Sequence, residues 1–281
     1  MDDFLRQISD LKIKPRKKLT YGETGNYRSQ SLGNSMDFYD HRQYIPQDDV
    51  RRIDWKAYMR TKNLYIRQFT EEKTIHIKVI MDNSLSMDYG TSVKFDLAKT
   101  LTKGIGYLTL NQGDIFSFVP LNNETYAETS IKGKDKFYQL FKVLDSISCE
   151  GMTDYENIIR LNEFNRERGG ITFLITDGFG ENIDKVLDFL CGRGEEVLFI
   201  QILSEDEVEP EVNDKLKLID KETNEIVKID INRIMKDMYK KKINSFIDNN
   251  RSMSLKRDIV YTFALSSDSP QEILRKTIGG M

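Results

Sequence analysis

From Thr74 onward, short apolar runs alternate with longer segments of helical periodicity, and this alternation limits the possible folds more than any other feature. Runs of about four to eight apolar residues bounded by turns indicate buried strands, whereas apolar residues repeating every three or four positions indicate helices. Strands joined through such helices pair in parallel, because a tight hairpin can connect only antiparallel neighbours. We therefore expect an α/β fold with a doubly wound, mostly parallel sheet.

Five apolar runs are expected to form buried strands and a sixth an edge strand: residues 75–81, 114–121, 171–176, 196–203 and 259–265, with 125–131 at the edge. Helical periodicity covers residues 93–110, 135–147, 154–167 and 182–191. The acidic segment 204–214 contains Pro210, and we expect it to be an exposed connection. Beyond it the pattern predicts a β-hairpin at 215–230, a helix at 231–247 and a short terminal helix that begins at Pro270.

The N-terminal part of the chain has a different pattern of apolar, charged and aromatic residues. Residues 2–12 place apolar side chains on one helical face, which predicts a short amphipathic helix that docks on the rest of the protein. Residues 15–70 are irregular and dense in charged and aromatic side chains, which favours a small β-rich module of strands and turns. These changes predict three parts: 1–73 as helix plus charged module, 74–204 as the core with the candidate site, and 205–281 completing the fold.

Composition excludes several classes of protein. Lys+Arg 42 against Asp+Glu 45 gives a net charge of −3, so no global field attracts nucleic acid or an anionic membrane. No apolar stretch approaches the ~20 residues that span a bilayer, and the first residues lack the apolar core of a secretory signal. With 2 cysteines and 2 histidines in the chain, a Cys/His metal cluster would require all four to converge, so we expect two reduced thiols. We therefore expect a cytoplasmic protein with no nucleic-acid partner and no membrane span.

Oxygen-bearing side chains follow the expected strands at the edge where open α/β sheets bind ligands. Asp82, Ser84 and Ser86 come directly after the strand 75–81, Asp177 follows the strand 171–176, and Thr153 lies in a loop between two helices. Two carboxylates and three hydroxyls suit a hard cation, which prefers oxygen ligands. The sequence therefore predicts a site for Mg²⁺, or for another divalent cation such as Mn²⁺ or Ca²⁺. The alternative is that Asp82 and the serines only cap the helix that follows.

The spacing D-x-S-x-S after the first strand, the later threonine and T-D-G after a central strand resemble the metal-ion-dependent adhesion site (MIDAS) of von Willebrand factor A domains. The resemblance implies that Ser84, Ser86 and Thr153 contact the metal through hydroxyls. Asp82 and Asp177 would act directly or through water. It also implies that an acidic residue of a protein partner completes the coordination.

A segment upstream of this site resembles a widespread prokaryotic family of unknown function that is often encoded beside MoxR-type AAA+ ATPases. That family's signature is approximately R-x-Y-x-x-G-D-D-x-R-x-I-D-W, and it is matched here by Arg42, Tyr44, Asp48, Asp49, Arg51, Ile53, Asp54 and Trp55. Gln47 stands where the family usually has glycine. The resemblance covers about residues 20–265 and implies an adaptor or partner of a MoxR-type ATPase.

The charged segment 48–56 allows two interpretations that do not depend on the resemblance. A partly buried ion network anchored by Trp55 would fix local geometry, whereas an exposed tryptophan beside arginines would favour docking of a partner. We favour the structural interpretation, because Trp55 lies among the apolar residues Ile53, Ala57 and Tyr58.

Enzymatic alternatives lack required residues. An aspartyl phosphotransferase motif, D-x-D-x-T, would need a second Asp where Ser84 stands. The chain contains neither G-x-S-x-G nor a G-x-x-x-x-G-K-[ST] loop. The main prediction is therefore a non-enzymatic, metal-dependent protein-binding module. The alternative is a metal-dependent hydrolase acting on a phosphorylated small molecule or nucleic acid, for which only Asp88 and Asp154 lie nearby as candidate bases.

Overall fold

The structure is a computed structural model that describes residues 2–16, 36–46, 48–71, 74–91, 93–122, 129–160, 169–210, 215–219, 226–230 and 233–280. The chain divides into two compact units, the larger formed by Met1–Glu23 with Ile75–Met281 and the smaller by Thr24–Thr74. Among the described residues, no helix combines the length and the apolar character needed to cross a membrane. Gln47, and parts of the segments predicted at 125–131, 154–167 and 204–214, lie outside the described residues.

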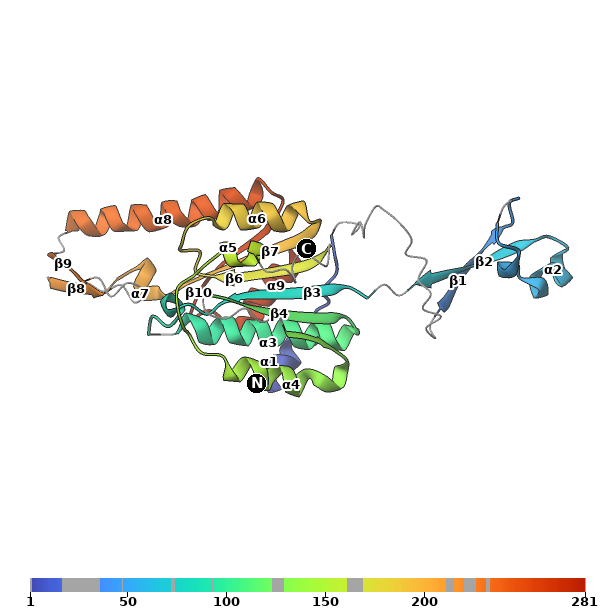
Figure 1. Ribbon diagram of the computed structural model, residues 1–281, viewed down its shortest axis with the longest axis horizontal. Coiled ribbons are helices and arrows are strands. Elements are labelled where there is room, and N and C mark those ends of the chain that lie inside the picture. Colours follow the sequence, from blue (N-terminus) through green and yellow to red (C-terminus); the bar gives the residue numbers. More distant parts are fainter. Residues whose placement is uncertain are drawn as a thin grey trace. The chain divides into compact units, whose positions relative to one another are not determined.

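A six-stranded sheet forms the centre of the larger unit (Figure 1). Its strands, in spatial order, are β10 (Val260–Leu265), β7 (Glu195–Leu203), β6 (Gly170–Thr176), β3 (His76–Asp82), β4 (Ile115–Leu121) and β5 (Thr129–Lys132). Neighbours pair in parallel except β5, which pairs antiparallel with β4. The order reverses direction between β3 and β6, so the carboxyl ends of these two strands meet at the switch point where open α/β sheets bind ligands.

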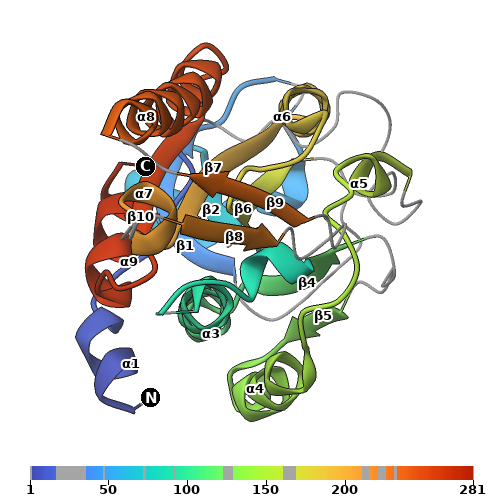
Figure 2. The same cartoon turned by 90° about the vertical axis from the view of Figure 1, so that its left-hand side faces the viewer.

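Helices cover both faces of this sheet (Figure 2). One face packs against α1 (Asp2–Ile8), α3 (Lys94–Gln112), α4 (Phe137–Ser146) and α9 (Pro270–Gly279), and the other against α5 (Glu156–Arg160), α6 (Ile183–Gly192) and α8 (Arg233–Leu255). Alternate side chains of β3 point to opposite faces of the sheet. Val79 and Met81 belong to the core under α3, and Ile80 belongs to the core under α6. The predicted doubly wound, mostly parallel α/β fold is confirmed.

Two segments of the larger unit differ from the prediction. Helix α8 extends to Leu255, beyond the predicted 231–247. The connection after β7 is not simply exposed, because it contains the short helix α7 (Glu205–Val208). Ser204 caps this helix in a reciprocal capping box with Glu207, and Ser204 is buried. The predicted hairpin is present as the antiparallel strands β8 (Lys215–Ile219) and β9 (Ile226–Asp230).

The smaller unit is built on an antiparallel pair of strands, β1 (Met36–Gln43) and β2 (Tyr65–Glu71). Between them lie a 3₁₀ turn (Val50–Arg52) and the helix α2 (Trp55–Thr61), which the sequence pattern did not predict. Asp54 starts α2, since its carboxylate accepts the backbone N–H groups of Lys56 and Ala57. Such a cap stabilises even a short helix.

Trp55 is not the buried anchor that we predicted. It is 56% exposed and Tyr58 is 36% exposed, whereas Ile53 and Ala57 are buried. The acidic side chains nearby have structural partners: Asp54 caps α2 and bonds His41. The segment thus combines structural carboxylates with an aromatic surface, and the prediction of a tryptophan-anchored network was wrong in its central residue.

His76, the first residue of β3, makes the stability of the larger unit depend on pH. Its Nε2 bonds the Ser117 hydroxyl on β4, and burial, with the charge of Lys78, lowers its pKa to about 4 from 6.5. Because the folded pKa lies below the unfolded one, the contribution to stability is complete above about 6.5 and is lost as pH falls towards 4. We expect wild type to lose about 2 kcal/mol more than His76→Gln between pH 7 and 4.5 in urea unfolding. Superimposable pH profiles of the two proteins would contradict this assignment.

Candidate metal centre

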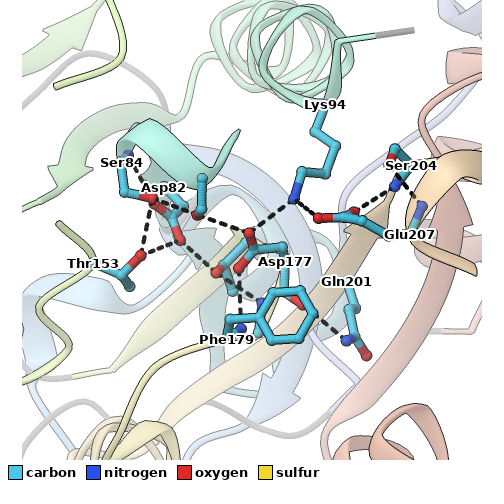
Figure 3. Close-up of polar contacts among 12 residues, drawn as sticks. Asp82, Ser84, Lys94, Thr153, Asp177, Phe179, Gln201, Ser204 and Glu207 are labelled. Carbon is cyan, nitrogen blue, oxygen red and sulfur yellow. Dashed lines mark hydrogen bonds and ion pairs between the residues drawn. The ribbon is translucent and has the colours of Figure 1, made fainter. Parts of the chain in front are cut away.

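The five residues predicted to bind a metal lie in one hydrogen-bonded cluster (Figure 3). Ser84 Oγ donates to Asp82 Oδ1 over 2.7 Å and lies 2.9 Å from Ser86 Oγ. Ser86 Oγ donates to Asp177 Oδ2 over 2.9 Å. Thr153 Oγ1 donates to Ser84 Oγ, also over 2.9 Å. Side chains from three separate loops therefore converge at the carboxyl edge of the sheet.

Backbone contacts between two of these loops place Thr153 beside the serines. Glu150 N–H donates to the carbonyl of Asn83 over 2.8 Å, and Leu85 N–H donates to the carbonyl of Gly151 over 3.1 Å. Gly151 has a φ of +63°, a conformation that glycine adopts without strain. The turn after β3 and the loop before α5 are thus joined through their main chains.

Helix capping does not explain the polar residues after β3. Ser84 occupies the N-cap position directly before a 3₁₀ turn (Leu85–Met87), but its side chain makes no capping bond there. The long helix α3 begins at Lys94 behind Val93, which has no capping side chain. The hydroxyl of Ser84 instead points into the cluster, so the capping alternative fails for the serines.

The site concentrates negative charge away from water. Asp82 and Asp177 are fully buried. Burial, and next the charge of Asp177, raise the pKa of Asp82 to about 7 from 3.8. Hydrogen bonds from Thr176 and Ser84 oppose that rise. A divalent cation would compensate two crowded carboxylates, and three hydroxyls converge with them, so the residues fit a hard metal ion.

Three further residues belong to the cluster that the sequence did not reveal. Thr176 Oγ1 donates to Asp82 Oδ2 over 2.6 Å. Lys94 Nζ lies 3.0 Å from Asp177 Oδ2 and 2.7 Å from Glu207 Oε1. Figure 3 shows Lys94 between these two carboxylates. Thr176 precedes Asp177 in the T-D-G motif, so its place in the motif could have indicated that it belongs to the cluster. Lys94 and Glu207 carry no motif, and only the folded chain brings them together.

Exposed apolar side chains occur in the same loops as the oxygen donors. Tyr89, Met152 and Phe179 are 41%, 42% and 37% exposed, one in each of the three loops. Within the described residues, no group of three or more His, Cys, Asp or Glu side chains could hold a metal, so a metal at this edge would depend on hydroxyl ligands. The candidate centre is therefore an oxygen cluster with large apolar side chains in its loops.

The sheet order and the helices on both faces define a doubly wound, mostly parallel α/β protein, as predicted. The chain belongs to the family described as a protein of unknown function, DUF58, whose model matches residues 40–246. This membership confirms the resemblance to a family of unknown function.

Both a sequence comparison and a comparison with solved structures find similar proteins. The chain is 24% identical over 238 residues to the uncharacterized protein Mb1516 of Mycobacterium bovis, covering 82% of this chain and 74% of that protein. Among solved structures it is similar to the conserved hypothetical protein BatB from Bacteroides thetaiotaomicron, with 15% identity, a TM-score of 0.44 and coverage of 73% and 97% of the two chains. The SpRpn10 VWA domain gives 12% identity, a TM-score of 0.44 and coverage of 74% and 98%.

Proposed function

We propose that this protein is a metal-dependent protein-binding module that acts without catalysis. Ser84, Ser86 and Thr153 would hold the divalent cation through hydroxyls, with Asp82 and Asp177 supplying charge directly or through water. Mg²⁺ is the ion we favour. When bound, the metal supplies an electrophilic position for the carboxylate of a partner's Asp or Glu. The partner we propose is a MoxR-type AAA+ ATPase, as the family resemblance implies.

The observation that carries this proposal is the pairing of oxygen donors with exposed apolar side chains in the same three loops. Contiguous exposed apolar patches mark interaction sites, and we propose that the exposed side chains of these loops form one. Tyr89, Met152 and Phe179 can therefore contact a partner that places its carboxylate in the centre. Interface cores are enriched in Tyr, Phe and Met, which are the residue types found here.

Hydrolysis of a phosphorylated compound is the second candidate, and one observation counts against it. The carboxylate of Asp154, the candidate base nearest to Thr153 in sequence, accepts the backbone N–H groups of Glu156 and Asn157. Its Oδ1 thereby caps α5, so this carboxylate already has a structural role. Phosphate release from a substrate panel by wild type, lost in Asp177→Ala, would favour the hydrolase instead.

The metal half of the proposal is tested by replacing both serines. Ser84→Ala/Ser86→Ala removes two neutral ligands without disturbing β3, so we expect Mg²⁺ affinity in calorimetry to fall at least about tenfold while the protein stays folded. Circular dichroism provides the folding control. Unchanged Mg²⁺ affinity in the folded double variant would refute the site.

The partner half uses the same variant in pull-down experiments. Complex formation should disappear in EDTA and in the Ser84→Ala/Ser86→Ala variant, yet change little when ionic strength is raised several-fold, because salt screens a short metal–carboxylate contact weakly. A partner that remains in EDTA but dissociates in salt would place the contact on a charged surface.

A further inference from the structure

We infer that Lys94 is an internal counter-cation that weakens divalent-metal binding at this centre, and that Glu207 on α7 controls how strongly it does so. This inference rests on the proposed metal site and adds a means of regulating it. It would make the metal affinity depend on the position of α7.

Lys94 lies inside the protein and not on its surface. Its side chain is 0% exposed, as is that of Asp177, and the side chain of Glu207 is 16% exposed. Charges removed from water interact strongly, because little solvent screens them. The ammonium of Lys94 therefore acts at short range on both carboxylates.

Lys94 and the proposed metal depend on the same carboxylate. Asp177 Oδ2 accepts hydrogen bonds from both Lys94 Nζ and Ser86 Oγ, so the ammonium occupies an oxygen at the edge of the donor cluster. A positive charge there reduces the negative charge with which Asp82 and Asp177 attract a cation. Removing that charge should strengthen metal binding.

Glu207 has the opposite effect, because it neutralises Lys94 from the other side. Among the contacts found in the described residues, it makes no direct bond to Asp82, Ser84, Ser86, Thr153 or Asp177, and its charge is paired with Lys94. Loss of the Glu207 charge leaves the ammonium uncompensated beside Asp177. Metal binding should then weaken.

The position of Glu207 is set by α7 and α8. Its carboxylate accepts Ser204 N–H over 2.8 Å within the capping box that starts α7, and its carbonyl accepts the Tyr239 hydroxyl of α8 over 2.6 Å. A displacement of α7 would separate Glu207 from Lys94 and lower metal affinity. By thermodynamic reciprocity, metal binding would favour the α7 position seen here.

Calorimetry with Mg²⁺ and Mn²⁺ on the full chain tests this arrangement through three variants. We expect Lys94→Met to bind at least about fivefold more tightly than wild type and Glu207→Gln at least about fivefold more weakly, within the usual range of coupling between sites. The double variant should bind more tightly than Glu207→Gln, because the ammonium that Glu207 would otherwise neutralise is gone. Lys103→Met is the matched control: this lysine lies on the same helix and pairs with Asp145 away from the centre, and its loss should leave affinity unchanged.

The outcomes separate this inference from the proposed function. Wild type that binds neither ion overturns the metal site and this inference with it. Wild type that binds, with variants that bind equally well or all more weakly, leaves the metal site standing and shows that the Lys94 ion pair is only structural. If Lys94→Met alone fails to fold, the comparison of Glu207→Gln with the double variant is the test. Metal binding that is weaker in Glu207→Gln and recovers in the double variant would show that the charge of Lys94 causes the loss.

Discussion

An Asp82→Ala variant is expected to lose the thermal stabilisation that excess Mg²⁺ gives the wild-type protein. A ligand at about 100 times its dissociation constant stabilises the folded state by about 2.7 kcal/mol, which shifts the melting temperature by several degrees. Asp82 is fully buried at the carboxyl end of β3 and accepts bonds from Ser84 and Thr176, so alanine removes a fixed carboxylate from the centre. Differential scanning calorimetry with Mg²⁺ and with EDTA measures the effect.

The same variant should show little loss of stability without metal. Burial raises the pKa of Asp82 to about 7, above its unfolded value of 3.8, so its ionisation costs stability as pH rises between these values. At pH 8 alanine removes that cost together with four hydrogen bonds, and we expect a net change of only about 1 kcal/mol. Loss of metal response with an intact fold separates a ligand from a structural residue.

Asp154→Asn is the matched control for Asp82→Ala. Asp154 lies next to Thr153 in sequence but caps α5, a role that asparagine can also fill. The control should therefore keep the full Mg²⁺ response. If Asp82→Ala responds to Mg²⁺ as strongly as the control, the ion does not bind where we place it.

Gly170→Ala is expected to destabilise the larger unit severely. Gly170 begins β6 with a φ of +113°, and a Cβ built there would lie 2.5 Å from the backbone carbonyl oxygen of His76 on β3. Because that oxygen belongs to the main chain of a central strand, it cannot move aside without disturbing the sheet. We expect the free energy of unfolding to fall by about 3 kcal/mol or more, as measured in urea.

Gly192→Ala provides the comparison. Gly192 ends α6, and a Cβ there meets nothing within 4 Å, so alanine should be neutral or slightly stabilising through its helix propensity. Equal stability of the two variants would show that β3 and β6 tolerate a side chain at their junction.

The sequence predicted the sheet because strand and helix periods are properties of local segments. It also predicted that Asp82, Ser84, Ser86, Thr153 and Asp177 lie together, because parallel strands carry the residues after their carboxyl ends to one edge. Asp82 and Asp177 are far apart in the chain, yet Ser86 links Asp177 to the donor cluster. Whether these residues bind metal remains a prediction.

Features that depend on three-dimensional packing could not be predicted from local sequence patterns. Helix α2 is short and depends on the cap from Asp54, so its apolar periodicity is too brief to detect. Trp55 has apolar neighbours in sequence, but helical geometry directs it to solvent while Ala57 is buried. The ion pair of Lys94 and Glu207 joins α3 to α7 across the sheet edge, a contact that no local pattern encodes.

The first residues of the chain belong to the larger unit, and this changes how the smaller unit is attached. Leu5 and Ile8 of α1 are buried against the core, and Asp10 bonds Arg275 of α9. The larger unit therefore holds the chain both before and after Thr24–Thr74. A force applied to the smaller unit would therefore act on two peptide connections to the larger unit. A single proteolytic cut in one connection would leave the smaller unit attached by the other.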